Sequence, residues 1–396
     1  MKKSIRDVEV TGKRVLVRVD FNVPQDPKTN EIMDDSRIIA ALPTIWYLIE
    51  HKAKIILCSH LGRPDGKVVE SMRMTPIAER LSQLTNLPIY TVSDCVGPKV
   101  QKAIAKLKNG DILLLENLRF HAEEEGNDAK FAQGLAELAD IYVDDAFGTA
   151  HRAHASTYGV AKYLPAYAGL LLEKELRVLG NLLDNAQHPF ATLLGGAKVS
   201  DKIKLINNMI NKVEILLVGG GMAATFLKAQ NYGVGLSAVE EDKKDLANQI
   251  MATAKSNNIA IILPLDVIVA DAVNDQAKPS IAPVSMIPAN KYIVDIGPQT
   301  IELFTENLKK CKTVFWNGPM GVYEIPQFSR GTKSMAELLA NLTSVTTVVG
   351  GGSTAEIVTE MHLGFKMTHV STGGGASMSF LEGKTLPGVE VLLDDK

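Results

Sequence analysis

The segment EILLVGGGM, residues 214–222, decides the fold class. Its apolar run has the length of a short buried strand, three glycines end that run, and the helical pattern MAATFLKAQ (222–230) begins at once. A strand that passes through glycines into a helix is one unit of a mostly parallel α/β sheet. Other segments of the second half end in the same way: ATLLGGAK (191–198), TVVGGGS (347–353) and THVSTGGGAS (368–377).

The apolar runs of the first half end in cationic and polar side chains instead. Helix-period patterns over residues 36–50, 75–84 and 129–138 lie between these runs, as crossovers between parallel strands require. Open parallel sheets bind ligands just outside the carboxyl ends of their strands. One half therefore offers fixed cations and the other bare backbone, which predicts two different anionic ligands. The four runs are RVLVRVDFN (14–22), IILCSHLGR (55–63), ILLLENLRF (112–120) and IYVDDAFGTAHR (141–152).

A chain of 396 residues exceeds the size at which one hydrophobic core keeps growing. We therefore expect an α/β protein of two Rossmann-like domains, with mostly parallel sheets flanked by helices and an interdomain helix between them. The stretch Leu164–Leu183 interrupts the alternation and is expected to form one long amphipathic helix, with no strand after Pro165. The expected boundaries are residues 1–165, 166–185 for the connector, 186–380, and 381–396 for a tail.

Composition excludes several classes of function. The chain is 46% hydrophobic and 22% charged, and its net charge of -3 supplies no bulk attraction for nucleic acid or an anionic membrane. Its three cysteines, Cys58, Cys95 and Cys311, form no C-x-x-C pair, which disfavours a disulfide framework and a thiolate metal site. The first residues lack the apolar core of a secretory signal, and Ile38–Ile49 is too short to span a bilayer. A reduced, cytoplasmic, soluble protein is expected.

The glycine endings favour phosphate as a ligand of the second half. A helix that opens after glycines presents backbone N–H groups at the positive end of its dipole. Lys198 and Lys202 are four residues apart, so on a helix opening after Gly196 they would share one face. The alternative is that the glycines only make tight turns and allow close packing.

The segment Gly219–Ala224 also satisfies G-x-G-x-x-A, and Glu240 and Glu241 follow at about the distance of a ribose-binding acid. This pattern would suit a dinucleotide dehydrogenase, although it lies in the second unit of its domain. A non-catalytic nucleotide-binding regulator is a further alternative. No G-x-x-x-x-G-K-[ST] sequence is present, which disfavours a P-loop enzyme.

The cations of the first half suit a small phosphorylated acid, because the planar fork of arginine matches carboxylate and phosphate oxygens in two-point contacts. Asp20 and Asn22 alternate with Phe21, so on a strand they would point to one face and accept hydrogen bonds from substrate hydroxyls. The cations are Arg18, Arg37, His60, Arg63, Arg119, His151 and Arg152.

Eight segments in register over nearly the whole length resemble the phosphoglycerate kinase family. The resemblance implies that the N-terminal domain binds 3-phosphoglycerate, that the C-terminal domain binds Mg-nucleotide, and that the tail returns to the N-terminal domain. It also implies a monomer. The segments are RVDFNVP (18–24), SHLGRPDG (59–66), LLENLRF (114–120), DAFGTAHRAH (145–154), GGAKVSDK (195–202), GGGMA (219–223), WNGPMGVYE (316–324) and STGGGAS (371–377).

Matched position by position, the family pattern implies two sets of site residues. The 3-phosphoglycerate site would comprise Asp20, Asn22, Arg37, His60, Arg63, Arg119 and Arg152. The nucleotide site would comprise Lys198, Lys202, Gly220, Gly221, Asn317, Pro319, Glu324 at the ribose, Gly351, Gly352, Ser353, Thr354, Gly373, Gly374 and Gly375. Arg37, Lys198, Gly351 and Gly374 would act in catalysis.

The implied reaction is reversible, in-line phosphoryl transfer from 1,3-bisphosphoglycerate to MgADP, which gives 3-phosphoglycerate and MgATP. Such a transfer requires positioning and charge neutralisation rather than acid or base help, because the carboxylate is already ionised and no hydroxyl proton must leave. The chain reads GGGS where many members read GGGD, so Ser353 replaces an aspartate near the metal. We therefore expect Mg²⁺ to be held mainly by nucleotide phosphates and water.

Overall fold

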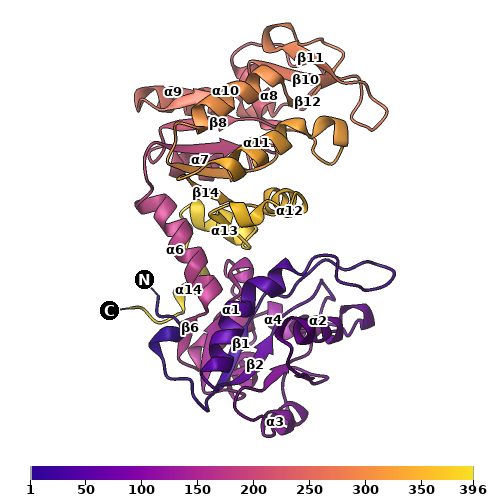
Figure 1. Cartoon of the computed structure of the whole chain (residues 1–396), viewed down its shortest axis with the longest axis vertical. Coiled ribbons are helices and arrows are strands. Elements are labelled where there is room, and N and C mark those ends of the chain that lie inside the picture. Colours follow the sequence, from indigo (N-terminus) through magenta and orange to yellow (C-terminus); the bar gives the residue numbers. More distant parts are fainter. Residues whose placement is uncertain (1, 396) are drawn as a thin grey trace. The chain divides into compact units, whose positions relative to one another are not determined.

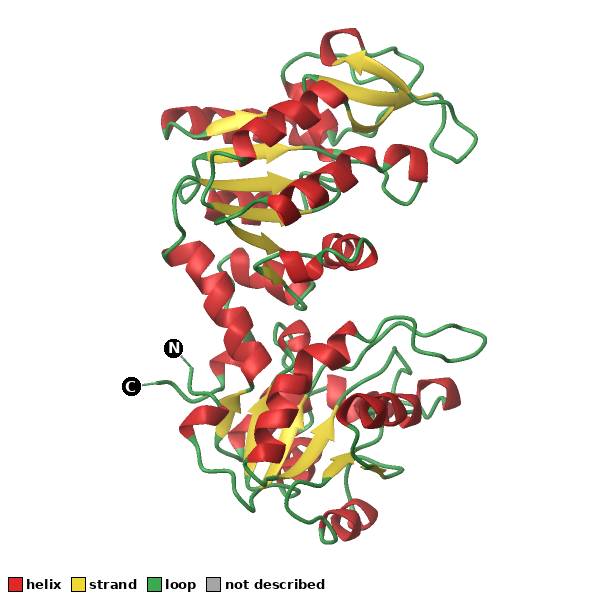
Figure 2. Cartoon of the chain, viewed as in Figure 1, coloured by secondary structure: helices red, strands yellow, loops and turns green. Residues whose placement is uncertain are grey.

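A computed structural model of the chain describes residues 2–395. The fold consists of two compact units, of which the first runs to Arg177 and takes in the chain again from Thr385, and the second runs from Val178 to Lys384. In each unit, helices pack against a parallel sheet (Figures 1 and 2). The predicted α/β class with mostly parallel sheets is confirmed.

The first unit contains a six-stranded sheet in the order β3-β4-β2-β1-β5-β6, and every neighbouring pair is parallel. All carboxyl ends of these strands therefore lie along one edge of the sheet. The strands are β1 (Arg14–Arg18), β2 (Lys54–Cys58), β3 (Ile89–Thr91), β4 (Ile112–Leu114), β5 (Ile141–Asp144) and β6 (Ala166–Ala168).

Both faces of this sheet are covered. Val15 and Val17 face one core together with Ile45 of α1 and Ile77 of α2, and the intervening Leu16 is also fully buried. Burial on both faces explains why the strands read as continuous apolar runs. The helices expected over residues 36–50, 75–84 and 129–138 are confirmed within two residues. The helices are α1 (Ser36–Glu50), α2 (Thr75–Thr85), α3 (Pro98–Ile104), α4 (Ala122–Glu125) and α5 (Ala129–Ala136).

The second unit repeats this arrangement with a six-stranded parallel sheet in the order β15-β14-β13-β7-β8-β9. It adds a three-stranded antiparallel sheet in the order β11-β10-β12, which the sequence patterns did not predict. The strands are β7 (Phe190–Leu194), β8 (Ile215–Val218), β9 (Ala260–Ile262), β10 (Asp266–Ala270), β11 (Ser280–Pro283), β12 (Tyr292–Ile296), β13 (Thr313–Asn317), β14 (Thr346–Val349) and β15 (His369–Val370).

Helices open directly after three of the strands of the second unit. Fully buried Trp316 of β13 lies in the main core with Phe304 of α10 and Met335 of α11. The helices are α7 (Ile203–Met209), α8 (Met222–Ala229), α9 (Lys244–Ser256), α10 (Pro298–Leu308), α11 (Arg330–Asn341), α12 (Gly352–Glu360) and α13 (Gly375–Leu381).

The expectation of one helix over Leu164–Leu183 is wrong. Residues Ala166–Ala168 form β6, which pairs with β5, and α6 (Leu170–Asp184) begins only after Gly169. The Ala168 amide donates to the Lys3 carbonyl at 2.9 Å, so this short segment gains partners on both sides. A three-residue strand is too short to show an alternating pattern in the sequence.

Residues from Thr385 onward belong to the first unit. After α14 (Pro387–Glu390), the Leu393 amide donates to the Ala166 carbonyl at 3.0 Å, and the Lys3 amide donates to the Leu393 carbonyl at 2.8 Å. Lys2 forms an ion pair with Asp394 at 2.8 Å. Segments from three distant parts of the sequence therefore meet at the β6 edge.

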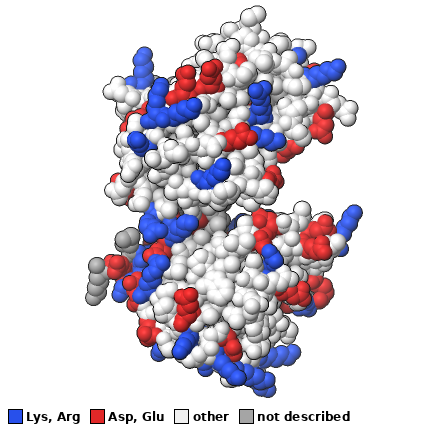
Figure 3. All heavy atoms as spheres, viewed as in Figure 1, with Lys and Arg blue, Asp and Glu red and all other residues white. Residues whose placement is uncertain are grey.

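On the face shown in Figure 3, acidic and basic side chains are interspersed over both units, and neither sign forms a continuous field. Among residues 2–395, no helix combines the length and apolar character needed to cross a lipid bilayer.

Asp145, which follows β5, holds the start of α6. Its buried Oδ1 accepts the Leu171 amide at 2.9 Å and the Leu172 amide at 3.2 Å. Burial raises the pKa of Asp145 to about 7. The folded state therefore keeps a proton that the unfolded chain loses near its ordinary pKa of about 3.9.

We predict that Asp145→Asn flattens the pH dependence of stability in the first unit. A carboxyl whose pKa is raised on folding makes the unfolding free energy fall as pH rises from about 4 to about 7, by up to about 1.4 kcal/mol per pH unit. Asparagine keeps the acceptor oxygen and removes the titration. Urea unfolding followed by Trp46 fluorescence, in a Trp316→Phe background, measures this slope. An unchanged slope would contradict the prediction.

Candidate active site

Loops that follow β1, β2 and β4 are tied together at the carboxyl edge of the first sheet. Asn22 Oδ1 accepts the Gly62 amide at 2.8 Å, and Arg119 Nη1 donates to the Gly62 carbonyl at 2.9 Å. These bonds place residues from the three loops side by side, as the parallel order requires. Asp20 and Asn22 do not lie on a strand, since β1 ends at Arg18, so the expected alternation along a sheet face is wrong.

Arg37 reaches this edge from α1 rather than from a strand end. It is the second residue of that helix, and its Nη1 lies 2.7 Å from Asp20 Oδ2. The Arg37 side chain is 36% exposed, whereas that of Asp20 is 10% exposed. The ion pair therefore holds the guanidinium over the edge and leaves part of it open to a ligand.

His60 lies at the centre of the cationic cluster. Its side chain is buried, and its pKa is held well below the ordinary value, first by burial and then by the charges of four arginines. Those arginines are Arg18, Arg119, Arg37 and Arg152, so three of the predicted substrate cations lie within electrostatic reach of one imidazole. Arg63 is exposed on the loop after β2.

Arg18 is among the cations predicted for the first half, although the residues matched to the family pattern do not include it. It is 1% exposed and donates to Ser156 Oγ at 2.8 Å, to the Val19 carbonyl, and to His60 Nδ1 at 3.1 Å. A guanidinium has donors only, so Nδ1 must accept, and the neutral ring carries its proton on Nε2. An arginine inside the apolar run RVLVRV was the available signal.

A buried acid offsets the charge of Arg18. Ser156 accepts from Arg18 and donates through Oγ to Glu124 at 2.6 Å, while its amide donates to the same carboxyl at 2.9 Å. Burial raises the pKa of Glu124, and Arg18 acts in the opposite direction. A hydrogen-bonded chain therefore runs from Glu124 through Ser156 and Arg18 to His60.

Loops after β7, β8 and β13 converge in the second unit. The Gly196 amide donates to the Pro319 carbonyl at 2.9 Å, and the Gly220 amide donates to the Met320 carbonyl at 3.0 Å. A Cβ at Gly220 would lie 2.6 Å from the Gly196 nitrogen, and its φ of +64° also favours glycine. The close approach of the Gly196 backbone therefore explains why position 220 is a glycine.

A cavity of about 330 Å³ opens beside these loops. Its walls are largely apolar and include Ala223, Ile293 and Met320, and an acid, Glu324, lies on its lining. An apolar slot with few polar groups is typical of a small-molecule site. The predicted residues on its lining are Gly220, Gly221, Pro319, Glu324 and Ser353.

Lys202 and the Gly350–Gly351 segment lie around Asn317, at the end of β13. Lys202 donates from Nζ to Asn317 Oδ1, and burial lowers the pKa of Lys202. Asn317 Nδ2 donates to the Gly350 carbonyl at 2.6 Å. Lys198 is exposed on the loop. The expectation that the two lysines share a helix face is wrong, because residues 195–202 form turns and α7 begins at Ile203.

Two helices start at the remaining glycines. Gly351, with φ +91°, precedes α12, and Gly374 precedes α13. Thr354 Oγ1 accepts the Gly318 amide at 2.7 Å, which links α12 to the loop after β13. The Gly373 amide donates to Ser371 Oγ at 3.2 Å and so already has a partner.

The G-x-G-x-x-A segment does not form a dinucleotide site with its predicted acid. Glu240 Oε2 accepts the Ser200 amide at 3.0 Å, and the Glu240 amide donates to Thr225 Oγ1 at 3.3 Å. Through its carboxylate and its backbone amide, Glu240 thus links the loop after β7 to α8. The Gly219 amide donates to the Leu194 carbonyl at 2.8 Å, so it too serves packing.

We predict that Arg18→Met releases the tautomer of His60. Without a donor at Nδ1, the ring protons redistribute between the two nitrogens, whereas the parent ring carries its proton on Nε2. ¹⁵N NMR of histidine-labelled protein distinguishes the two. Arg18→Lys, which restores a cationic donor, should return the Nε2–H form. If the parent ring were protonated on Nδ1, the assignment would fail.

Comparisons with known proteins agree over nearly the whole chain. The family model "Phosphoglycerate kinase" matches residues 5–384. A phosphoglycerate kinase of Pelotomaculum thermopropionicum is 55% identical to this chain over 393 residues, and the match covers 99% of each chain. One of Dictyoglomus turgidum is 53% identical over 390 residues, with 98% of each chain covered.

Solved structures show the same relationship. The phosphoglycerate kinase of Coxiella burnetii matches with a TM-score of 0.89 at 40% identity, covering 99% of this chain and 98% of that one. That of Pyrococcus horikoshii matches with a TM-score of 0.82 at 32% identity, covering 98% of each. Sequence and fold therefore agree along the same residues, and the chain belongs to the phosphoglycerate kinase family.

Proposed function

We propose that the first unit binds 3-phosphoglycerate and the second binds Mg-nucleotide, in the family reaction between 1,3-bisphosphoglycerate and ADP. The observation that carries this assignment is the cluster of four arginines around His60, in which Arg37 is paired with Asp20 and Arg119 with Glu125. Such a cluster suits a ligand that bears both a carboxylate and a phosphate. The second unit offers an apolar cavity beside glycine-led helix starts, which suits a base and its phosphates.

In the first unit, Arg37, Arg63, Arg119 and Arg152 would bind the anionic oxygens of the substrate. His60 would donate from Nε2, because Arg18 occupies Nδ1. Its lowered pKa keeps the ring neutral near neutral pH, so we assign it hydrogen bonding rather than charge. Asp20 and Asn22 would accept from substrate hydroxyls beside their contacts with Arg37 and Gly62.

In the second unit, the cavity would hold the adenosine, with Gly220, Gly221 and Pro319 on its walls and Glu324 at the ribose. Lys202 and Asn317 would contact the nucleotide phosphates, joined by exposed Lys198. Backbone groups of the α12 and α13 starts would add further donors. These are Gly351, Gly352, Thr354, Gly373 and Gly374.

The residues near the α12 start fit Mg²⁺ only in a supporting role. The first turn of α12 carries no acidic residue, and Ser353, which is exposed and lines the cavity, offers one neutral oxygen. Mg²⁺ accepts oxygen ligands and retains several waters, so its charge would be met by the nucleotide phosphates. When bound, the ion neutralises charge on the phosphoryl oxygens. Ser353 would orient that complex.

The transfer itself needs no nucleophile or general base from the protein. The carboxylate is ionised in either direction of the reaction and no hydroxyl proton must leave, so the residues must align the reacting oxygens and stabilise charge on the moving phosphoryl group. We assign that role to Arg37, Lys198 and the backbone of Gly351 and Gly374. Cys58, Cys95 and Cys311 are buried free thiols and take no part.

The two ligands are assigned to different units, so in-line transfer requires the units to bring them together and exclude water. We place the hinge in the segment 166–185, between domains of residues 1–165 and 186–380, with residues 381–396 attached to the first. We also propose a cytoplasmic location, because the three cysteines are free and buried. We propose a monomer on the family resemblance.

We predict that Arg37→Ala lowers turnover by about 100- to 1,000-fold, because one positioned donor to the developing charge is lost. Nucleotide affinity should stay unchanged. A coupled assay of 3-phosphoglycerate-dependent ATP consumption gives the turnover, and calorimetry gives the affinity.

Two matched variants sharpen this test. Arg14→Ala removes a surface arginine paired with Asp140 and should leave turnover intact. Lys202→Ala should weaken nucleotide binding as well as turnover. Near-parental turnover in Arg37→Ala would remove Arg37 from the catalytic set.

We predict that the radius of gyration from solution X-ray scattering falls only when 3-phosphoglycerate and Mg-nucleotide are both bound. Each ligand alone should leave the profile close to that of the free protein, because closure needs contacts from both. Identical profiles in all four states would argue against closure.

A further inference from the structure

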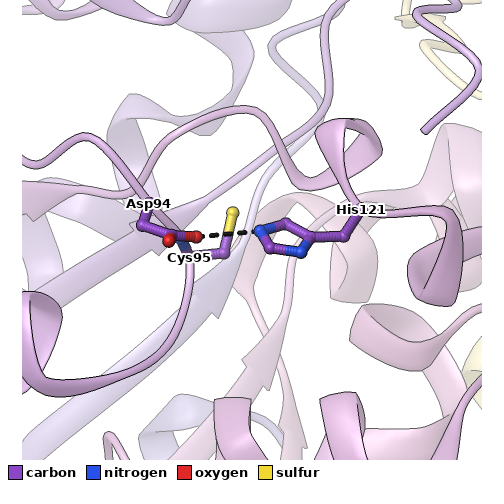
Figure 4. Close-up of side chains that lie close together, drawn as sticks. All are labelled: Asp94, Cys95 and His121. Atoms are coloured by element: carbon purple, nitrogen blue, oxygen red, sulfur yellow. Dashed lines mark hydrogen bonds and ion pairs between the residues drawn. The ribbon is translucent and has the colours of Figure 1, made fainter. Parts of the chain in front are cut away.

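A second cluster of ligand-type side chains lies in the first unit, outside the residues assigned to substrate. Asp94 and Cys95 lie on the loop between β3 and α3, and His121 precedes α4. One ligand atom from each residue lies within 4.8 Å of the other two. Figure 4 shows the carboxylate and the imidazole facing each other, with the thiol beside the line that joins them.

The contacts within the cluster fix its geometry. His121 Nε2 lies 2.8 Å from Asp94 Oδ1, and that oxygen also accepts the Cys95 amide at 2.7 Å. The His121 ring packs against Phe131 with ring centroids 4.9 Å apart. Cys95 Sγ donates to the Glu116 carbonyl at 3.0 Å. These contacts hold the three ligand atoms close together before any ion binds.

One side of the cluster is open and the other is closed. Cys95 is fully buried, whereas the side chains of His121 and Asp94 are 29% and 46% exposed. The carboxyl of Glu116 is already used by Arg73 at 2.9 Å and by two backbone amides, so it offers no further ligand. An ion would therefore enter from the side of Asp94 and His121, with the thiol beneath it.

We propose that Asp94, Cys95 and His121 bind one divalent transition-metal ion of the zinc class, with solvent at the fourth position. Nitrogen, oxygen and sulfur ligands together suit a tetrahedral borderline-soft ion. Mg²⁺ prefers oxygen ligands in octahedral geometry, so it does not compete well here. This site is separate from that of the nucleotide metal and does not depend on the proposed function.

Binding exchanges protons for the ion. The Cys95 S–H bond breaks as the sulfur–metal bond forms, and the proton goes to solvent. His121 gives up to solvent the Nε2 proton that it donates to Asp94, and it then coordinates through Nε2 with one proton on Nδ1. Asp94 shifts its Oδ1 from the imidazole to the ion. The cluster loses the contact between Asp94 and His121 and the hydrogen bond from Cys95 Sγ to the Glu116 carbonyl, and it gains three bonds to one cation.

The test uses Co²⁺ as a spectroscopic substitute for Zn²⁺, titrated into the full-length protein with excess Mg²⁺ and no nucleotide. We expect one equivalent to bind with a near-ultraviolet thiolate-to-cobalt charge-transfer band. Cys95→Ser should abolish that band. His121→Asn changes a partly exposed residue. We expect it to lower the affinity for Co²⁺ by about 10-fold or more, because changes to residues that only contact a metal ligand already cause a loss of that size.

Matched controls come from similar groups that lack a complete cluster. His188 and Glu214 form a histidine–carboxylate pair at 2.8 Å, and Cys311 is a buried thiol in the second unit. His188→Gln and Cys311→Ser should leave the band and affinity unchanged. The absence of a charge-transfer band in the parent, its persistence in Cys95→Ser, or unchanged affinity in His121→Asn would overturn the proposal.

Discussion

Parallel strand pairing is the constraint on which the rest of this structure depends. Because each strand must return to the same end of its sheet through a crossover, all the strand-to-helix loops of a unit meet at one edge. In the first unit this edge brings Asn22, Gly62 and Arg119 into one hydrogen-bonded set, although they are far apart in sequence. In the second unit it brings Gly196, Gly220 and Pro319 into backbone contact. The parallel strand order therefore determines which loops come together, and the side chains on those loops determine the chemistry of the candidate site.

Burial of charge is the second determinant. Arg18 lies inside the first unit, where an unpaired cation would be costly, and each of its donor nitrogens finds an acceptor. The same contacts that satisfy the guanidinium also orient His60. The hydrogen bonds that stabilise the buried guanidinium therefore also position His60. Arg18 acts on the candidate site through His60 and is itself buried.

Long periodic patterns made most of the fold predictable. The apolar runs that became β1, β2, β7 and β8 are continuous because both sheet faces are buried, and α1 spans the residues its period indicated. Short elements were not predictable. β6 has three residues, and the turns between Gly195 and α7 follow local hydrogen bonding that a lysine spacing does not report. The role of Arg18 and the meeting of Cys95 with His121 both depend on contacts across distant residues, which one sequence does not encode as a local pattern.

The two units differ in how the chain completes them. The second is one continuous segment, whereas the β6 edge of the first needs Leu393 against Ala166 and Lys3. During synthesis the second unit can therefore finish before the first, although most of the first emerges earlier. Until residues from Thr385 onward leave the ribosome, the β6 edge lacks its last hydrogen-bond partner. The order of translation and the order of structural completion are thus reversed in this protein.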